Sequence, residues 1–227
     1  KFIGLDKIAP MIFDIMVDLK NKAISKRFME NYGFTVTEFI EGTYSRNNKN
    51  FDIKDKDTIR DLTSLMTWKN QQSEVSSIFL NAFVLAGYDE ENGFNIYHYE
   101  LRNNFYWHRV QTCYIAEGSG RHSVDPTMYS FVENLDLNTR RGNIDRVDGI
   151  MALLYGVVTA MDHEIGVGGY PSITIINGRE SNYKNRIREI NDDRSHLAGQ
   201  IVRAINFKAI EYKEGYELID ELFYKEG

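Results

Sequence analysis

The chain has 227 residues, of which 42% are hydrophobic, 13% aromatic and 26% charged, and its formal net charge is −6. This composition is typical of a soluble globular protein with a sizeable core, and it argues against a disordered chain. The acidic balance, with a sequence pI near 5.5, argues against nucleic acid as a partner, because such binding needs a basic surface.

The chain begins with a predicted helix. Apolar residues from Ile8 to Leu19 recur at i, i+3, i+4, i+7, i+8 and i+11, which predicts a helix with one buried stripe. This helix is expected to run to about Tyr32 and to end at Gly33. The predicted stripe consists of Ile8, Met11, Ile12, Ile15, Met16 and Leu19.

A polar segment and a second helix follow. Residues 42–56 are rich in Asn and Lys and predict an exposed loop. Asp57 is then predicted to cap a helix. The apolar side of that helix carries Ile59, Leu62, Leu65 and Met66.

Three strands are predicted in the middle of the chain. Residues 77–87 form an almost unbroken apolar run, which predicts a strand covered on both faces. A turn at 89–93 and an alternating run at 94–99 predict its hairpin partner. A turn at 103–104 leads to a third predicted strand, 107–116.

The last part of the chain alternates helices with one strand. Gly118, Ser119 and Gly120 precede a helix predicted at about 125–134. A longer helix begins near Asp145 and ends before the glycines of 166–169, and a strand follows at 173–176. Asp193 is predicted to cap the next helix.

The arrangement of these elements predicts the fold class. Blocks of helices around an antiparallel meander are typical of an α+β fold. No repeat or linker interrupts residues 1–227, so a single domain is predicted. Residues 208–227 alternate apolar and charged side chains, and predict either a final strand and helix or an arm that packs on a neighbouring subunit.

Compartment signals favour the cytoplasm. No apolar run approaches the roughly 20 residues of a membrane-spanning helix, and no signal-peptide pattern opens the chain. Cys113 is the only cysteine, which excludes an internal disulfide and favours a reducing compartment. Its place in a predicted strand indicates a buried, unreactive thiol. We expect a cytoplasmic protein without a membrane partner, with the nucleus as a second location if the chain is eukaryotic.

Three stretches carry a resemblance to a known family: "FVLAGYDEENGFNIYHYE" at 83–100, "YIAEGSG" at 114–120 and "ALLYGVVTAMDHEIGVGGYPSITIING" at 152–178. In their order and spacing they resemble proteasome β-type subunits of the N-terminal nucleophile (Ntn) hydrolase superfamily, over about residues 1–180. The resemblance implies a four-layer αββα sandwich that lacks its first strands in this chain. It also implies homologous subunits in a ring assembly and a peptide or amide substrate.

The resemblance assigns roles to two side chains and a backbone corner. Ser119 and Asp162 match supporting residues of the catalytic centre, and Gly118 and Gly120 flank Ser119 where backbone N–H groups face an oxyanion. This corner suits an oxyanion, because glycine permits close approach of the backbone and the start of a helix attracts negative charge. The alternative is an ordinary strand-to-helix turn with Ser119 as the N-cap.

Departures from the family pattern favour a non-catalytic subunit. The family's nucleophile is a threonine at the mature N-terminus, whereas Lys1 has no hydroxyl or thiol. The resemblance therefore places any nucleophile before Lys1, and the chain is expected to be a processed or trimmed sequence. The family's serine after the helix-ending aspartate is replaced by Ile165 or Val167, which donate no hydrogen bond. If the protein is active, it is expected to be a threonine-type peptidase.

Two alternatives stay open beside the structural subunit. One is an active Ntn amidohydrolase or peptidyl transferase whose nucleophile precedes Lys1. The other is a structural binding module without chemistry. A Ser119–His122 pair is not favoured, because the nucleophile-elbow context G-x-S-x-G is absent.

Metal ligands are not predicted. Asp162, His163 and Glu164 are consecutive, and neighbours on a helix point about 100° apart, so they cannot converge on one ion. The other histidines show no HExxH or comparable spacing: His98, His108, His122 and His196. His98 alternates with its strand neighbours, which favours a structural role. No metal and no cofactor are expected.

Overall fold

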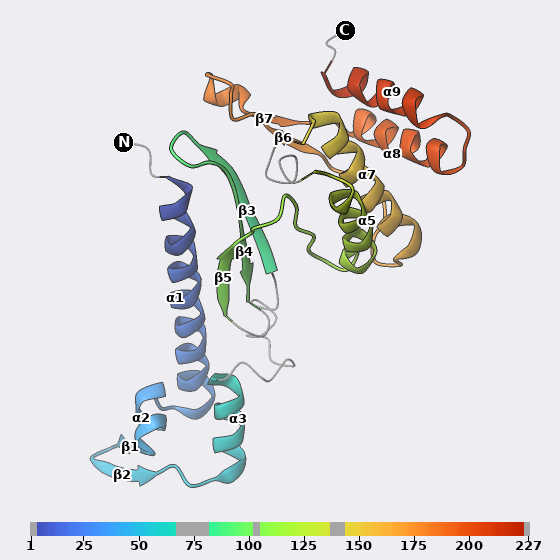
Figure 1. Cartoon of the computed structure of the whole chain (residues 1–227). Helices are drawn as coiled ribbons and strands as arrows, with labels where there is room; N and C mark the ends of the chain where they lie inside the picture. The colour runs from blue at the N-terminus through green and yellow to red at the C-terminus, as the bar shows by residue number, and fades with distance from the viewer. Residues whose placement is uncertain (1–3, 67–81, 102–104, 137–143, 225–227) are drawn as a thin grey trace. The chain divides into compact units, whose positions relative to one another are not determined.

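The computed structural model describes residues 4–66, 82–101, 105–136 and 144–224 (Figure 1). Contacts divide the chain into two compact units. Unit 1 comprises Lys1–Ala86 and Ile96–Arg109, and unit 2 comprises Gly87–Asn95 and Val110–Gly227. Each unit combines helices with short strands, so the fold is α+β, as predicted. The single domain stays a prediction.

Unit 1 contains helices, a hairpin and most of a three-stranded sheet. Its elements are α1 (Leu5–Tyr32), α2 (Val36–Glu41), β1 (Thr43–Arg46), β2 (Lys49–Asp52), α3 (Lys56–Met66), β3 (Ala82–Asp89), β4 (Gly93–Glu100) and β5 (Tyr106–Arg109). The strand order of the larger sheet is β3-β4-β5, and β4 and β5 are antiparallel. Residues 77–81 of the strand predicted at 77–87, and the whole of the turn predicted at 103–104, lie outside the described residues.

Helix α1 ends as the sequence predicts. Gly33 adopts φ 73° and its N–H donates to the carbonyl of Met29, a left-handed C-cap that glycine permits. The prediction of one buried stripe is wrong in part. Met11, Ile15 and Leu19 are 52%, 57% and 48% exposed. The helix is apolar on more than one side, and the side that carries the small residue Ala9 packs on the sheet.

The contact between α1 and the sheet centres on Tyr99. Tyr99 and Ala9 are both fully buried, and the Tyr99 hydroxyl donates to the Ala9 carbonyl oxygen at 2.9 Å. The Phe83 ring stacks on Tyr99 with the ring centroids 4.3 Å apart. Tyr97 and Trp107 belong to the same cluster. One face of the sheet is therefore an aromatic layer beneath α1.

The segment predicted as a loop at 42–56 is instead a hairpin followed by a helix start. Strands β1 and β2 pair antiparallel, with Arg46 opposite Lys49. Asn47 and Asn48 form the turn with φ of 51° and 59°, values that asparagine tolerates in tight hairpins. The side chains of the hairpin are almost all exposed, as expected for a loop, but the backbones of β1 and β2 are hydrogen-bonded to each other.

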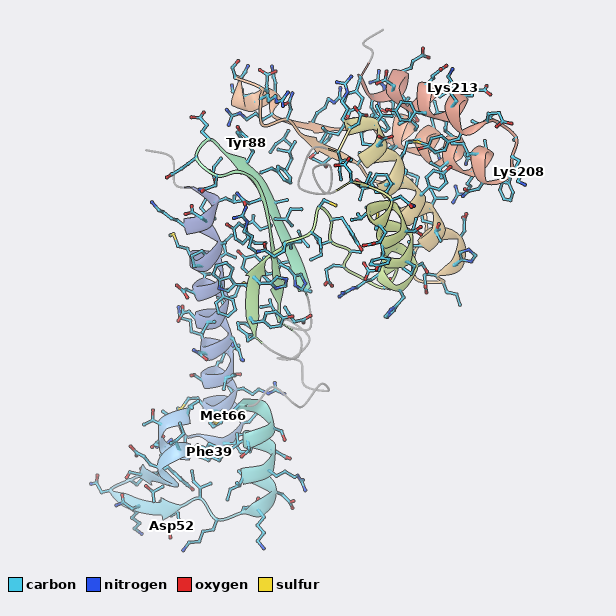
Figure 2. The ribbon with its side chains drawn as sticks, viewed as in Figure 1. Phe39, Asp52, Met66, Tyr88, Lys208 and Lys213 are labelled. Carbon is cyan, nitrogen blue, oxygen red and sulfur yellow. The ribbon has the colours of Figure 1, made fainter. Side chains whose placement is uncertain are left out.

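The caps of the neighbouring helices also differ from the prediction. The unpredicted α2 has Thr35 as its N-cap, where a capping box joins Thr35 and Glu38. Asp55, rather than Asp57, caps α3 by accepting from the Thr58 amide at 2.7 Å. Leu62 on α3 is fully buried, as predicted; the Leu65 side chain is outside what is described. Phe39 and Met66, labelled in Figure 2, pack on the same cluster as Leu62.

Unit 2 contains the hairpin tip and the remaining elements. These are α5 (Arg121–Glu133), α7 (Arg146–His163), β6 (Thr174–Ile176), the short 3-10 helix η1 (Tyr183–Asn185), β7 (Ile187–Glu189), α8 (Asp192–Asn206) and α9 (Tyr212–Tyr224). β6 pairs antiparallel with β7, which was not predicted. α8 is capped by Asn191, which accepts from the Arg194 amide, and not by Asp193. Of the described residues 208–224, a turn and bend at 208–210 precede α9, and none forms a strand.

The strand predicted at 107–116 is wrong beyond Arg109. Residues 110–116 form no strand, because an apolar run needs a paired neighbour to become one. Cys113 therefore lies in an irregular segment and is only partly buried. Desolvation still raises the pKa of its thiol, which lowers the population of reactive thiolate at neutral pH.

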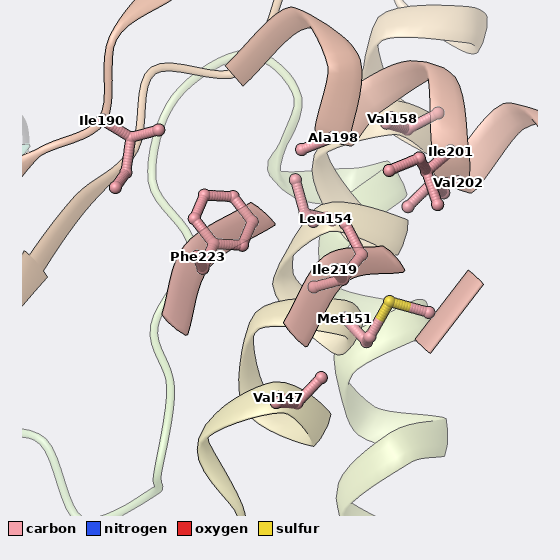
Figure 3. Close-up of a cluster of buried hydrophobic side chains, with 10 residues drawn as sticks. All are labelled: Val147, Met151, Leu154, Val158, Ile190, Ala198, Ile201, Val202, Ile219 and Phe223. Atoms are coloured by element: carbon pink, nitrogen blue, oxygen red, sulfur yellow. The ribbon is translucent and has the colours of Figure 1, made fainter. Parts of the chain in front are cut away.

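The core of unit 2 lies between α7, α8 and α9. Figure 3 shows its ten buried side chains gathered between these helices. They are Val147, Met151, Leu154, Val158, Ile190, Ala198, Ile201, Val202, Ile219 and Phe223. Gly215 allows the last two helices to approach closely, since a β-carbon there would lie 2.3 Å from Ile205 Cδ1. No described helix combines the length and the apolar character needed to cross a bilayer.

The hairpin tip packs on the segment between β6 and β7. Tyr88, labelled in Figure 2, lies on Gly178, where a β-carbon would meet the Tyr88 ring at 2.3 Å. Arg186 lies 5.9 Å from the centre of that ring and pairs with Glu90 at 3.6 Å. The lack of a side chain at Gly178 thus leaves room for the Tyr88 ring, which holds the turn at 89–93 against this segment.

We expect Tyr99→Phe to lower the free energy of unfolding by about 1–2 kcal/mol, because the buried Ala9 carbonyl loses its donor. Burial also raises the pKa of Tyr99 to about 12, above its ordinary value of 10.0. This contribution is present below pH 10 and is lost as the pH rises towards 12. Urea denaturation at neutral and alkaline pH measures both effects. Tyr106→Phe, at an exposed position, should change neither.

Asp145 should matter for the attachment of α9. Its Oδ1 accepts from the Val147 amide at 2.9 Å and from the Tyr216 hydroxyl at 3.0 Å. We expect Asp145→Ala to cost about 1 kcal/mol and Asp145→Asn, which keeps an acceptor, to cost less. The Val147 amide bond lowers the pKa of Asp145 below its ordinary 3.8, so this stability should fall only as the pH drops below that value. Acid titration of the stability of the wild type and of both variants tests this, because only the wild type carries the carboxylate. Equal losses of stability in the two variants at neutral pH would contradict the role of the acceptor.

Candidate functional site

The Gly118-Ser119-Gly120 corner forms the start of α5. Gly118 adopts φ 108°, a conformation that side chains disfavour. Gly120 is the N-cap, so the alternative of Ser119 as N-cap is not what the structure has. The carbonyl oxygens of Gly118 and Gly120 accept from the amides of Arg121 and Ser123 at 3.2 and 3.0 Å. The carbonyl oxygens of the corner therefore accept the first hydrogen bonds of α5.

Gly120 brings this corner against the end of α7. A β-carbon at Gly120 would lie 2.9 Å from Ala160 Cβ and 3.0 Å from Val167 Cγ2. Further along the same helix pair, a β-carbon at Gly156 would lie 3.1 Å from Val124 Cγ1. The absence of side chains at these two glycines sets the spacing of α5 and α7.

Ser119 lies at the surface, beside the loop that follows α7. Its side chain is exposed, and its Oγ would lie 3.4 Å from a β-carbon built on Gly166. Among the described residues, no hydrogen bond joins Ser119 to His122. The predicted supporting serine is thus accessible, but no base is bonded to it.

Asp162 faces a different neighbour. Its Oδ1 accepts from Arg203 Nε at 3.2 Å and from Arg203 Nη2 at 2.9 Å, which joins α7 to α8. Two positions along a helix correspond to a rotation of about 200°, so Asp162 points away from the side on which Ala160 meets the corner. Within the described residues, the structure does not bring the side chains of Ser119 and Asp162 together.

Sequence reasoning missed the polar contact that does join the corner to α7. Ser123 Oγ donates to Glu164 Oε1 at 2.7 Å, between residues 41 positions apart. No motif or spacing signals this pair, because it depends on how α5 packs on α7. Arg121 beside it contacts Glu117 and Asp125 at 3.4 and 2.9 Å, so the charges around the corner are paired.

The residues around the Gly118-Ser119-Gly120 corner pack helices together and do not form a catalytic group. Val167, one of two residues at the place of the family's serine, contacts Gly120. Ile165, the other, is completely exposed. The Asp162 side chain accepts from α8, and the Glu164 side chain accepts from α5. These two side chains therefore point in different directions, as expected. In the part of the chain that the structure describes, no group of three or more His, Cys, Asp or Glu side chains converges.

Comparisons with known proteins identify no relative. A scan against protein-family models finds no match, and neither do searches among curated proteins and solved structures. The resemblance to proteasome β-type subunits therefore rests on the residues of this chain alone and stays a prediction.

Gly120 provides a test of the corner. We expect Gly120→Ala to lower the free energy of unfolding by about 1–3 kcal/mol, the usual cost of overpacking, because the rigid Ala160 Cβ must move. Gly168→Ala is the matched control, since Gly168 lies next to Val167 on the loop after α7 and a β-carbon there meets open space. Chemical denaturation compares the two variants. Equal stabilities would contradict the close approach of α5 and α7.

Proposed function

We propose that this chain is a proteasome-like subunit of a multi-subunit peptidase assembly and that its role is structural rather than catalytic. The observation that carries the proposal is the Gly-Ser-Gly corner at the start of α5, seated against the end of α7 through Gly120, Ala160 and Val167. The resemblance predicts a strand-to-helix corner that flanks the nucleophile, and the start of α5 at Gly120 supports the helix part of that corner.

The order of the elements supports the same proposal. The hairpin β3-β4 and strand β5 precede the corner, α5 and α7 follow it, and the short β6-β7 sheet comes next. This order agrees with the order of the family landmarks in the sequence. The four-layer αββα sandwich, with strands in addition to those of this chain, is part of the proposal.

The surroundings of the corner favour a structural subunit over an active one. A supporting aspartate would have to face the nucleophile, whereas Asp162 is engaged by Arg203 on α8. The serine expected after the aspartate is replaced by an apolar residue, either Ile165 or Val167. Ser119 alone cannot activate a nucleophile, because activation needs an adjacent base.

An exposed apolar stripe on α1 supports a place in an assembly. Met11, Ile15 and Leu19 stand at i, i+4 and i+8, so they lie on the same side of the helix, and each is about half exposed. We call these three residues the α1 stripe. Contiguous apolar surface of this kind is typical of protein–protein contacts. In the proposal, a homologous neighbouring subunit covers it.

The proposal predicts a native particle of several hundred kilodaltons that contains this 26.4 kDa chain. Native mass measurement of the endogenous protein, with intact-mass analysis and N-terminal sequencing, tests this. A covalent electrophile aimed at N-terminal nucleophiles should leave this subunit unmodified. A labelled N-terminal Thr, Ser or Cys would instead establish the active hydrolase, and a free monomer would refute the assembly.

The α1 stripe allows a sharper test of assembly. We expect Ile15→Asp to release the subunit from the particle, because a charge would be buried without a partner. Ile40→Asp is the matched control, since Ile40 on α2 is the same residue type and is 69% exposed, somewhat more than Ile15. Native mass of both variants gives the result. Retention of Ile15→Asp would show that the stripe is not an interface.

A further inference from the structure

The turn after β6 contains an asparagine followed by glycine. The sequence has two such pairs, Asn92-Gly93 and Asn177-Gly178, and both asparagines are exposed. Asparagine is among the thermolabile residues. Its carboxamide is attacked most easily by the next backbone nitrogen when that nitrogen belongs to glycine, because glycine has no side chain to obstruct the approach. The surroundings of the two pairs differ, and they favour reaction at Asn177.

The side chain of Asn177 is folded back over the peptide bond that follows it. Its Oδ1 accepts from the Arg179 amide at 3.1 Å, and its backbone carbonyl oxygen accepts from the Glu180 amide at 3.3 Å. The Asn177 amide donates to the Arg186 carbonyl oxygen at 2.7 Å. A side chain bonded to the amide two residues on passes over the nitrogen between them. Cγ of Asn177 and the Gly178 nitrogen are therefore held near each other, as a reacting pair must be.

The same hydrogen bond assists an attack on Asn177. When the Gly178 nitrogen adds to Cγ, negative charge develops on Oδ1. The Arg179 amide already donates to this oxygen. A donor that is in place before the charge forms stabilises the transition state without reorganisation. The turn therefore supplies both the approach of the nitrogen and a partner for the oxyanion.

Asn92 stands in a less favourable place. It follows three carboxylates, Asp89, Glu90 and Glu91, and its own amide donates to Asp89 Oδ1 at 2.6 Å. Like charges repel, so these carboxylates oppose negative charge in a transition state at Asn92. The turn at 177–180 instead carries one cation and one carboxylate. Within the described residues, no amide donates to the Asn92 side-chain oxygen.

We propose that Asn177 is a site of spontaneous deamidation through a cyclic imide formed with Gly178. The Gly178 nitrogen loses its proton to water and bonds to Asn177 Cγ. The bond from Cγ to NH₂ then breaks, and the leaving group takes up a proton from water and departs as ammonia. Water opens the imide at either of its carbonyl groups, which leaves aspartate or isoaspartate. The net change replaces NH₂ by OH and needs no oxidant or reductant.

The isoaspartate product displaces the residue on which the hairpin turn rests. In isoaspartate the chain runs through the former side chain, so it is longer by one methylene group immediately before Gly178. The Tyr88 ring fits so closely that a β-carbon on Gly178 would lie 2.3 Å from it. Packing of this kind does not tolerate a moved backbone, so isoaspartate releases the turn at 89–93. The site lies wholly in unit 2 and does not rest on the proposed assembly function.

Incubation of the full chain at mildly alkaline pH in H₂¹⁸O, followed by peptide mapping by mass spectrometry, tests the site. We expect Asn177 to be converted about tenfold faster than Asn92, a difference that requires only about 1.4 kcal/mol of additional transition-state stabilisation. The converted peptide should carry ¹⁸O and elute as two isomers. Asn177→Gln should keep its carboxamide, because its longer side chain must close a larger ring. Conversion of Asn92 in that variant is the internal control.

Hydrogen exchange measures the consequence for the hairpin. The amides of the turn at 89–93 should exchange faster in the isoaspartate-containing chain than in Asn177→Gln held for the same time. Amides of α7 are the control and should exchange equally in both. The proposal is overturned if Asn177 keeps its carboxamide, or if Asn92 is converted as fast as Asn177 or faster. Unchanged exchange at 89–93 after conversion would overturn the release of the turn. None of these outcomes depends on whether the chain enters a particle.

Discussion

The close approach of α5 to α7 is the contact on which the rest of unit 2 depends. Gly120 lets the first turn of α5 reach Ala160 and Val167, and Gly156 lets the middle of α7 reach Val124. One side of α7 is occupied in this way, and its opposite side forms the core with α8 and α9. A helix buried on two sides is held in one rotation about its axis, which fixes where each of its polar side chains points.

That rotation separates the two residues for which the resemblance implies a common role. With Ala160 facing the corner, Asp162 turns towards α8 and pairs with Arg203. The pair is partly exposed, with side chains 26% and 39% accessible, and such pairs contribute only about 0–1 kcal/mol. The contact is therefore weak enough for another partner to displace it. Asp162 is directed by helix rotation far more than by its ion pair.

Some local signals were predictable from the sequence, and long-range contacts were not. Gly33 ends α1 and α7 starts next to Asp145, as predicted, because helix ends depend on a few neighbouring residues. The caps predicted at Asp57 and Asp193 were each misplaced by two residues, to Asp55 and Asn191. The hairpin at Asn47 was missed, since two exposed polar strands carry no apolar alternation. The strand predicted through Cys113 was wrong, because no strand pairs with that apolar run. Ser123 and Glu164 meet only through helix packing, which no spacing reveals.

The position of His98 opposite His108 follows from the same constraint that builds the core of unit 1. Residues of β4 alternate between faces, so burial of Tyr99 beneath α1 requires His98 to face the other way. A slip of one residue would move His98 and Glu100 under α1 and Tyr99 to the opposite face. The hydroxyl of Tyr99, bonded to Ala9, opposes that slip. Pairing with β5 then sets His108 opposite His98. The aromatic core and the placing of His98 opposite His108 are thus two consequences of one strand register, which no spacing along the chain reveals.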